Sequence, residues 1–235
     1  MRLIGVDGCR GGWVTATSDD SLAHLDFGLA ASFADVLKAA NGRAALIAVD
    51  IPIGLPDRGP RTCDMEARRC LGQRRGSSVF PVPSRRTLQA VANYRLACAL
   101  NAANGGKRIS RQVFNILRKI REVDDLMAPA VQAWVREAHP EVTFALLWPA
   151  DGPLHGKKRA AGEMERLAIL QHLVPTFDLG AERERVGHNG VARDDLVDAV
   201  ACLVTAHRVK HHRAIVLPRG DPPLDSRGLR MEIVA

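Results

Sequence analysis

Residues 1–12 are Met1-Arg2-Leu3-Ile4-Gly5-Val6-Asp7-Gly8-Cys9-Arg10-Gly11-Gly12, and they indicate how the fold begins. Their apolar run, residues 3–6, is typical of a buried strand. Asp7 ends this run, and the glycines after it allow a tight turn. A second β-prone run at residues 13–17 then predicts a hairpin. A carboxylate at such a strand end can hold a metal ion or merely stabilise the turn, and this stretch alone leaves both alternatives open.

The next elements extend this hairpin into an α/β core. Residues 24–28 predict a third strand, and residues 32–38 predict a helix. Ser32 is expected to cap that helix, with Asp35 as the acid of a capping box. Three strands followed by a helix predict a meander that the helix crosses.

A second acid ends a second core strand. Residues 44–49 are continuously apolar, as expected of a strand buried on both faces, and Asp50 follows them. If this strand lies beside the first, Asp7 and Asp50 lie together at one end of the sheet. Two carboxylates in that position repel each other unless a cation lies between them.

The middle of the chain, residues 57–136, predicts a helix-rich basic insertion within a single domain of residues 1–235. Residues 77–83 predict an extended loop with two prolines. The helices expected in this block are residues 61–71, 87–104, a helix beginning at 110–117, and 128–137.

The last third of the chain carries the remaining acids. Glu141 introduces an apolar run, residues 142–147, which predicts a strand, and residues 163–173 predict an amphipathic helix. Two short strands are expected in the tail, at residues 214–217 and 229–234.

The final large helix is predicted at residues 193–206. Asp195 and Asp198 are at positions i and i+3 of this helix, so their carboxylates share one face. Acids in a first turn also suit the helix dipole, and Asp194 can serve as a cap. A paired acidic face beside a buried stripe is costly without a cation or basic partner, so we expect metal binding by this pair.

Composition narrows the class of protein. A hydrophobic content of 46% and a charged content of 25% are typical of a globular protein. No apolar run reaches the roughly 18 residues of a membrane span, and the first residues lack a signal-peptide pattern, so we expect a cytoplasmic protein without a membrane partner. The five cysteines are odd in number and no pair is spaced CxxC, which argues against a disulfide framework and a structural zinc site.

The positive charge is concentrated in one segment. The net charge is +7, yet residues 67–121 hold 13 Lys or Arg and no acid, which leaves the rest of the chain at −6. Such asymmetry indicates nucleic acid or another phosphate-rich ligand. The alternative is a solvated basic face that acids elsewhere in the fold balance.

The acids and the basic segment together suggest one chemistry. Oxygen ligands suit Mg²⁺ or Mn²⁺, and no cluster of His or Cys in the sequence indicates zinc. Two such ions can activate a water and stabilise the leaving oxygen in phosphodiester hydrolysis. The residues therefore predict a metal-dependent nuclease.

Five blocks of the chain together carry a family resemblance: residues 5–13, 49–55, 78–81, 139–141 and 194–199. They resemble the domain-of-unknown-function family number 429. Its members are described as predicted nucleases of the ribonuclease H-like superfamily. The resemblance implies an RNase H-like mixed sheet, with an antiparallel three-strand meander plus parallel strands, flanked by helices.

The resemblance also implies roles for individual residues. Holliday-junction resolvases of that superfamily place one acid on the first strand, a second after a later strand, and an Asp-x-x-Asp pair on a late helix. The second acid there is usually Glu, whereas this chain has Asp50. Glu141 belongs to the narrower family's pattern, as a direct ligand or a supporting group. The implied metal ligands are Asp7, Asp50, Asp195 and Asp198, which with Glu141 form the predicted catalytic set.

Basic residues supply the expected substrate contacts. We expect them to hold the phosphate backbone by charge. The predicted contacts are Arg10, Arg68, Arg69, Arg74, Arg75 and Lys158.

Two rival functions remain open from the sequence. One is an ATP-dependent phosphotransferase or ATPase of the actin-like branch, although no second phosphate loop is evident. The other is a non-catalytic nucleic-acid-binding module that kept the fold. The sequence sets neither the choice of DNA, RNA or nucleotide nor the oligomeric state.

Overall fold

The structure is a computed structural model of the whole chain, and it describes residues 1–148, 155–187 and 190–235. The chain forms two compact units. The first unit comprises residues 1–50, 134–215 and 234–235. The second comprises residues 51–133 and 216–233.

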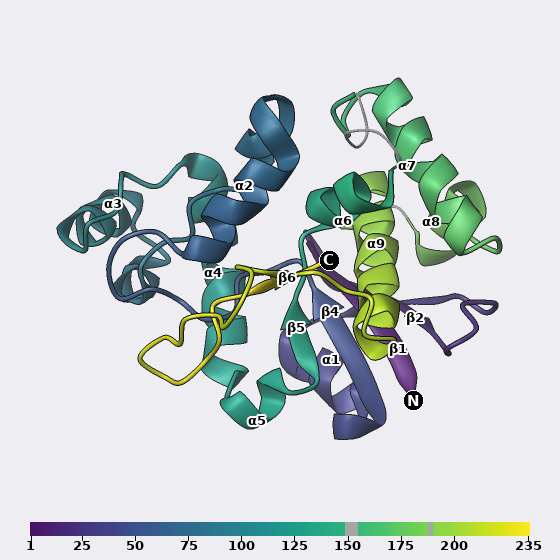
Figure 1. Cartoon of the computed structure of the whole chain (residues 1–235), viewed down its shortest axis with the longest axis horizontal. Coiled ribbons are helices and arrows are strands. Elements are labelled where there is room, and N and C mark those ends of the chain that lie inside the picture. The colour runs from purple at the N-terminus through teal and green to yellow at the C-terminus, as the bar shows by residue number, and fades with distance from the viewer. Residues whose placement is uncertain (149–154, 188–189) are drawn as a thin grey trace. The chain divides into compact units, whose positions relative to one another are not determined.

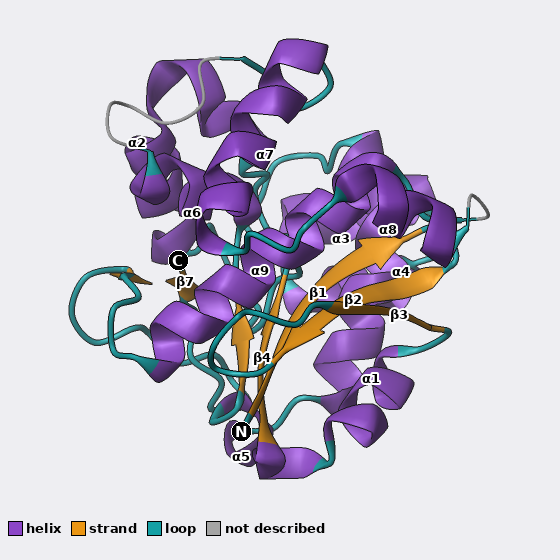
Figure 2. Ribbon diagram, turned by 90° about the vertical axis from the view of Figure 1, so that its right-hand side faces the viewer, coloured by secondary structure: helices purple, strands orange, loops and turns teal. Residues whose placement is uncertain are grey.

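The first unit is built on a five-stranded mixed sheet of order β3-β2-β1-β4-β5. β1, β2 and β3 form an antiparallel meander, while β4 and β5 run parallel to β1. Figure 2 shows the sheet in orange with helices packed around it. The predicted α/β class with a mixed, helix-flanked sheet is therefore confirmed. The strands are β1 (Arg2–Cys9), β2 (Gly12–Ser18), β3 (Asp26–Ala30), β4 (Ala45–Val49) and β5 (Val135–Glu137).

The longest described helix, α9, lies across one face of β1, β2 and β4 (Figure 1). The opposite face receives α1, whose Phe33 ring lies 5.1 Å from the ring of Trp13 on β2, measured between centroids. The helices of this unit are α1 (Phe33–Ala40), α6 (Pro140–Leu147), α7 (Ala160–Leu173), α8 (Leu179–Val186) and α9 (Arg193–Lys210), with a short 3₁₀ turn, η1 (Gly42–Ala44).

Gly5 lets α9 approach β1 closely. A Cβ atom added to Gly5 would lie 2.0 Å from the carbonyl oxygen of Ala199 and 2.1 Å from the amide nitrogen of Leu203. Contacts that short do not occur, so only glycine permits this helix–strand distance. The packing fixes the height of α9 over the strand that carries Asp7.

α1 begins as its sequence predicts. The Ser32 side chain accepts from the Asp35 amide, and the Asp35 carboxylate accepts from the Ser32 amide, which completes the capping box. Asn41 ends the helix in the left-handed conformation.

The second unit is mainly helical, and the insertion predicted at residues 57–136 overlaps it. Buried ion pairs hold it together: Arg61 Nη2 lies 2.6 Å from Asp64 Oδ1, and Arg85 Nη1 lies 2.6 Å from Asp124 Oδ2. Its helices are α2 (Thr62–Arg75), α3 (Tyr94–Ala103), α4 (Arg111–Leu126) and α5 (Pro129–Gln132), with the 3₁₀ turns η2 (Gly76–Ser78) and η3 (Arg85–Ala90).

The strand predicted at residues 142–147 is wrong, because this stretch belongs to helix α6. Pro140 occupies the first turn of α6, where its fixed φ and missing N–H are compatible with a helix, and Glu141 follows it. A short apolar run does not distinguish a buried strand from a buried helix.

Two predicted helices are also revised. The helix expected at residues 87–104 is divided into η3 and α3, because Asn93 takes an extended conformation and caps α3 through the amide of Leu96. The helix expected at residues 128–137 is instead the short α5 followed by strand β5. Pairing of β5 with β4 supplies the hydrogen bonds that favour a strand there.

The described cysteines are all free thiols, and Cys70 is the exposed one. Among the described residues, no helix combines the length and apolar composition needed to cross a membrane.

In the tail, Ile215 and Ala235 exchange two backbone hydrogen bonds of 2.8 and 3.0 Å. The short strands there are β6 (Val216–Leu217) and β7 (Ile233–Val234).

Candidate functional site

The first two acids lie level on neighbouring parallel strands, Asp7 within β1 and Asp50 directly after β4. Val6 of β1 pairs with Val49 of β4, so the next residues, Asp7 and Asp50, are level across the sheet. The Asp50 amide donates to the carbonyl of Val6 at 2.9 Å, which continues this register. Because side chains alternate along a strand, Asp7 faces the same side as Gly5, the side that α9 covers.

α9 brings the third acid to this sheet edge. Asp198 is 3% exposed and lies one residue before Ala199, which packs against Gly5. Cys202 is one turn further along α9. Burial is the main cause that raises the pKa of its thiol, and the charges of Asp50 and Asp7 add to this effect. We call Asp7, Asp50, Asp195 and Asp198 together the acidic site.

Burial and mutual repulsion raise the pKa values of the carboxylates in the acidic site. Burial, followed by the charges of Asp50 and Asp198, raises the pKa of Asp7 well above its ordinary value. Burial and the charge of Asp198 raise the pKa of Asp50 to about 7. Acids with raised pKa values cluster at functional sites, where a bound cation offsets their repulsion.

Asp195 lies at the edge of this group. Its Oδ2 accepts from the Ala192 amide at 2.7 Å, so Asp195, rather than Asp194, closes the N-terminus of α9. Burial raises the pKa of Asp195 to about 6, although the hydrogen bond from Ala192 lowers it. Asp195 lies one helical turn before Ala199, which packs against Gly5, so it shares the side of α9 that faces β1.

Lys157 supplies a cation to the acidic site. Its Nζ lies 2.5 Å from Asp198 Oδ2 and 3.8 Å from Asp194 Oδ2. Burial lowers the pKa of Lys157, but the surrounding carboxylates outweigh it and the pKa is raised. The other oxygen of Asp198, Oδ1, is buried and has no hydrogen-bond partner among the described residues. A buried carboxylate oxygen left in this state has unused capacity for a cation.

The turn that carries Lys157, residues 155–159, is held by an arginine. Arg166 on α7 donates through Nη1 to the carbonyl oxygens of His155, at 3.2 Å, and Gly162, at 2.6 Å. Gly162 packs closely here, since an added Cβ would lie 2.2 Å from the Gly156 carbonyl oxygen. The position of Lys157 therefore follows from packing on α7.

Glu141 is bound to the same arginine. Arg166 donates to Glu141 Oε1 through Nε at 3.0 Å and to both Glu141 oxygens through Nη2 at 2.8 Å. Both side chains are nearly buried, at 1% exposure for Arg166 and 7% for Glu141. The structure thus joins Glu141, through Arg166, to the turn that carries Lys157. Burial raises the pKa of Asp198, while Lys157 and, to a smaller extent, His139 at the start of α6 lower it.

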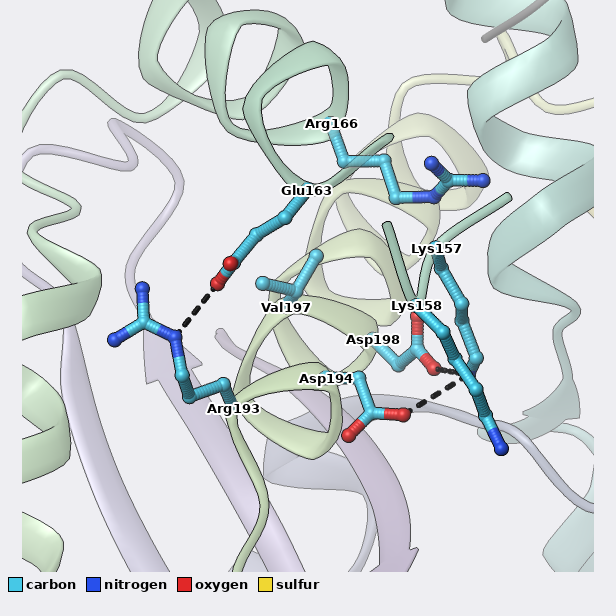
Figure 3. Close-up of a pocket in the computed structure, with 8 residues that line it drawn as sticks. All are labelled: Lys157, Lys158, Glu163, Arg166, Arg193, Asp194, Val197 and Asp198. Carbon is cyan, nitrogen blue, oxygen red and sulfur yellow. Dashed lines mark hydrogen bonds and ion pairs between the residues drawn. The ribbon is translucent and has the colours of Figure 1, made fainter. Parts of the chain in front are cut away.

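An open pocket of about 370 Å³ adjoins this arrangement (Figure 3). Lys157 reaches across it toward Asp194 and Asp198, and Arg193 pairs with Glu163 at 2.7 Å. Lys158 is exposed at its rim. The pocket is lined by Lys157, Lys158, Glu163, Arg166, Arg193, Asp194, Val197 and Asp198.

The other predicted substrate contacts lie on elements that do not line this pocket. Arg10 is exposed in the turn between β1 and β2. The four remaining arginines lie on α2 in the second unit, where Arg69 and Arg74 are exposed. Arg68 is half-buried and donates through Nε to the Val79 carbonyl at 2.9 Å.

Sequence reasoning missed Lys157 and Arg166 as parts of the site. The basic turn at residues 156–159 was a visible signal, but it predicted only Lys158 as a contact. No sequence signal marked Arg166, because its burial and its pairing with Glu141 are seen only in the structure.

One family matches the chain, and the match covers residues 5–222. The searches of curated proteins and of solved structures gave no match. Residues 5–222 include every member of the acidic site, together with Lys157, Glu141 and Arg166. The chain therefore belongs to the family described as "Protein of unknown function (DUF429)".

Proposed function

We propose that this chain is an RNase H-like, metal-dependent phosphodiesterase that hydrolyses nucleic acid. One observation supports the proposal: Asp7 on β1, Asp50 after β4 and Asp198 on α9 lie at the same end of the sheet, and the buried Oδ1 of Asp198 has no partner among the described residues. The mixed sheet also has the layout that the RNase H-like resemblance implies, a meander of three strands with further parallel strands.

The donor set fits Mg²⁺ or Mn²⁺, which prefer oxygen ligands. Asp7, Asp50 and Asp198 would hold the metal, and Asp195 would join them by giving up its bond to Ala192. In the described residues, the ligand atoms of these acids are not all within 4.8 Å of one another. Lys157 stands at Asp198 instead, so we expect metal binding to draw the carboxylates together and displace the ammonium.

Bound divalent cations would supply a water of lowered pKa and neutralise charge on the phosphate. The chain's own residues would do the rest. Asp7 and Asp50 would orient the metal against the sheet edge, and Glu141 would position the Lys157 turn through Arg166. Once displaced from Asp198, Lys157 would be placed to bind a phosphate oxygen of the substrate.

The basic residues favour nucleic acid as the substrate. Arg193 and Lys158 border the pocket beside Asp198, and 13 basic residues lie between residues 67 and 121 without an acid among them. Phosphate contacts of this kind bind a backbone without reading its sequence. Arg10, Arg68, Arg69, Arg74, Arg75 and Lys158 are the residues proposed for these contacts.

The test is cleavage of end-labelled DNA and RNA, single- and double-stranded, with Mn²⁺. The Asp7→Asn variant should lose cleavage and keep its thermal stability, whereas Asp26→Asn, which changes an exposed acid on β3, should cleave as the wild type does. Binding without cleavage in the wild type would instead support a non-catalytic module. Hydrolysis of ATP with no cleavage of nucleic acid would support the phosphotransferase alternative.

A further inference from the structure

A second cluster of metal-binding side chains lies at the far end of α9 from Asp198. His207 lies in the last turn of α9, His211 is the residue that caps the C-terminus of this helix, and Asp20 comes from the turn after β2. One carboxylate oxygen of Asp20 and one ring nitrogen of each histidine all lie within 4.8 Å of one another. Within the described part of the chain, no other group of three such side chains meets that limit.

The helix preorganises the two histidines. Residues at positions i and i+4 share one face, and the rings of His207 and His211 lie 4.5 Å apart between centroids. His211 Nε2 lies 2.8 Å from Asp20 Oδ1, and a ring nitrogen of His207 lies within 4.8 Å of an oxygen of the same carboxylate. Both histidines are thus already oriented toward the same turn.

Two nitrogen donors and one oxygen donor distinguish this cluster from the acidic site. Imidazole nitrogen suits Zn²⁺ and its neighbours in the first transition row, whereas Mg²⁺ and Mn²⁺ prefer oxygen. A cation is also favourable at the C-terminal end of a helix, where carbonyl groups point outward. Three protein ligands leave the fourth tetrahedral position of zinc to a water molecule.

We propose that Asp20, His207 and His211 form a zinc-binding site, separate from the acidic site and independent of the proposed nuclease activity. The ion would join the turn after β2 to the end of α9, between residues 191 positions apart in the sequence. It would thereby stabilise the packing of α9, the helix whose other end carries Asp195 and Asp198.

The cluster also has a metal-free form. Lys210 Nζ lies 2.7 Å from Asp20 Oδ1, with 48% of the Asp20 side chain and 35% of the His211 side chain exposed. Lys210 forms an ion pair with this oxygen, and His211 is within hydrogen-bond distance of the same oxygen. Zinc would replace the direct contact between His211 and Asp20. The metal-free and zinc-bound forms therefore differ in this contact, and zinc-binding measurements distinguish them.

The test is zinc binding to the purified chain, followed by competition with a chromophoric zinc indicator. His207→Gln and His211→Gln should each weaken zinc binding by more than about tenfold, the smallest loss typical of removing even an outer partner of a metal ligand. His212→Asn is the matched control, because His212 is an exposed neighbour outside the cluster, and asparagine tolerates its positive φ of 52°. This control should bind zinc as the wild type does.

Zinc X-ray absorption gives a second readout. Two imidazole nitrogens at about 2.0–2.1 Å are expected in the wild type. Zinc affinity that is unchanged in both histidine variants would overturn the proposal, as would the absence of any zinc binding by the wild type. Loss of zinc binding in Asp198→Asn but not in the histidine variants would also overturn it, by placing the ion at the acidic site.

Discussion

Lys157 Nζ lies 2.5 Å from Oδ2 of Asp198, so a lysine 41 residues earlier in the chain neutralises a buried carboxylate of α9. The same ammonium also interacts with Asp7 and Asp50. The chain thus carries a tethered cation at the position where the proposed function requires a metal ion.

Removing that cation should strengthen metal binding. In Lys157→Met, Mn²⁺ no longer competes with the ammonium for Asp198, and we expect its dissociation constant to fall by about tenfold, or about 1.4 kcal/mol. Calorimetry on the purified chain measures this. Lys158→Met is the matched control, since Lys158 lines the same pocket but is exposed. Equal affinity in Lys157→Met and the wild type would show that Lys157 does not compete with the metal.

The acidic site should make metal-free stability depend on pH. Burial and Asp198 raise the pKa of Asp50 to about 7, from an unfolded value near 4, so the folded state binds this proton more tightly than the unfolded state. The ionised carboxylate therefore lowers stability above about pH 7, and this cost disappears as the pH falls toward 4. Asp50→Asn should raise the melting temperature at pH 8 by about 2–4 °C, equivalent to about 1 kcal/mol.

Thermal melts in a metal-chelating buffer at pH 8 and pH 5.5 test this prediction. The gain from Asp50→Asn should be smaller at the lower pH, where Asp50 is protonated in the wild type. Asp26→Asn should show no such gain, because Asp26 is exposed on β3. A lower melting temperature for Asp50→Asn at pH 8 would contradict the raised pKa.

Close packing at Gly5 should be indispensable to the site. Gly5→Ala places a methyl group against the backbone of α9 at Ala199 and Leu203. Overpacking of this kind costs about 1–3 kcal/mol, and more where backbone must move. We expect a lower melting temperature together with weaker Mn²⁺ binding, because α9 carries Asp198. Gly11→Ala is the control, since its added Cβ would lie 3.6 Å from the nearest atoms. A melting temperature equal to that of the wild type would contradict this packing.

The sequence predicts some parts of this arrangement and not others. The Asp7 and Asp50 pair follows from two apolar strands that each end in an acid, because parallel neighbours place such ends together. The pair of Lys157 and Asp198 does not follow, since it depends on how α7 holds a turn far from α9 in sequence. The strand prediction for residues 142–147 is wrong for another reason. Nearly all of these residues are apolar, so their periodicity favours neither a helix nor a strand.

The ion pair of Glu141 and Arg166 should be structural. Glu141→Gln leaves a buried guanidinium without its carboxylate, and we expect a loss of about 3–5 kcal/mol in the free energy of unfolding. The double variant Glu141→Leu/Arg166→Met removes both charges and should recover most of that loss. Denaturant unfolding measures both. A double variant no more stable than Glu141→Gln would contradict the pairing.

The central claim is a shared carboxylate site for a divalent metal, and Mn²⁺ calorimetry on the wild type, Asp7→Asn and Asp198→Asn tests it most directly. The account predicts binding by the wild type and its loss in both variants, although Asp7 and Asp198 lie on different elements. Retention of wild-type affinity in either variant, or no binding by the wild type at millimolar Mn²⁺ with nucleic acid present, would contradict the account.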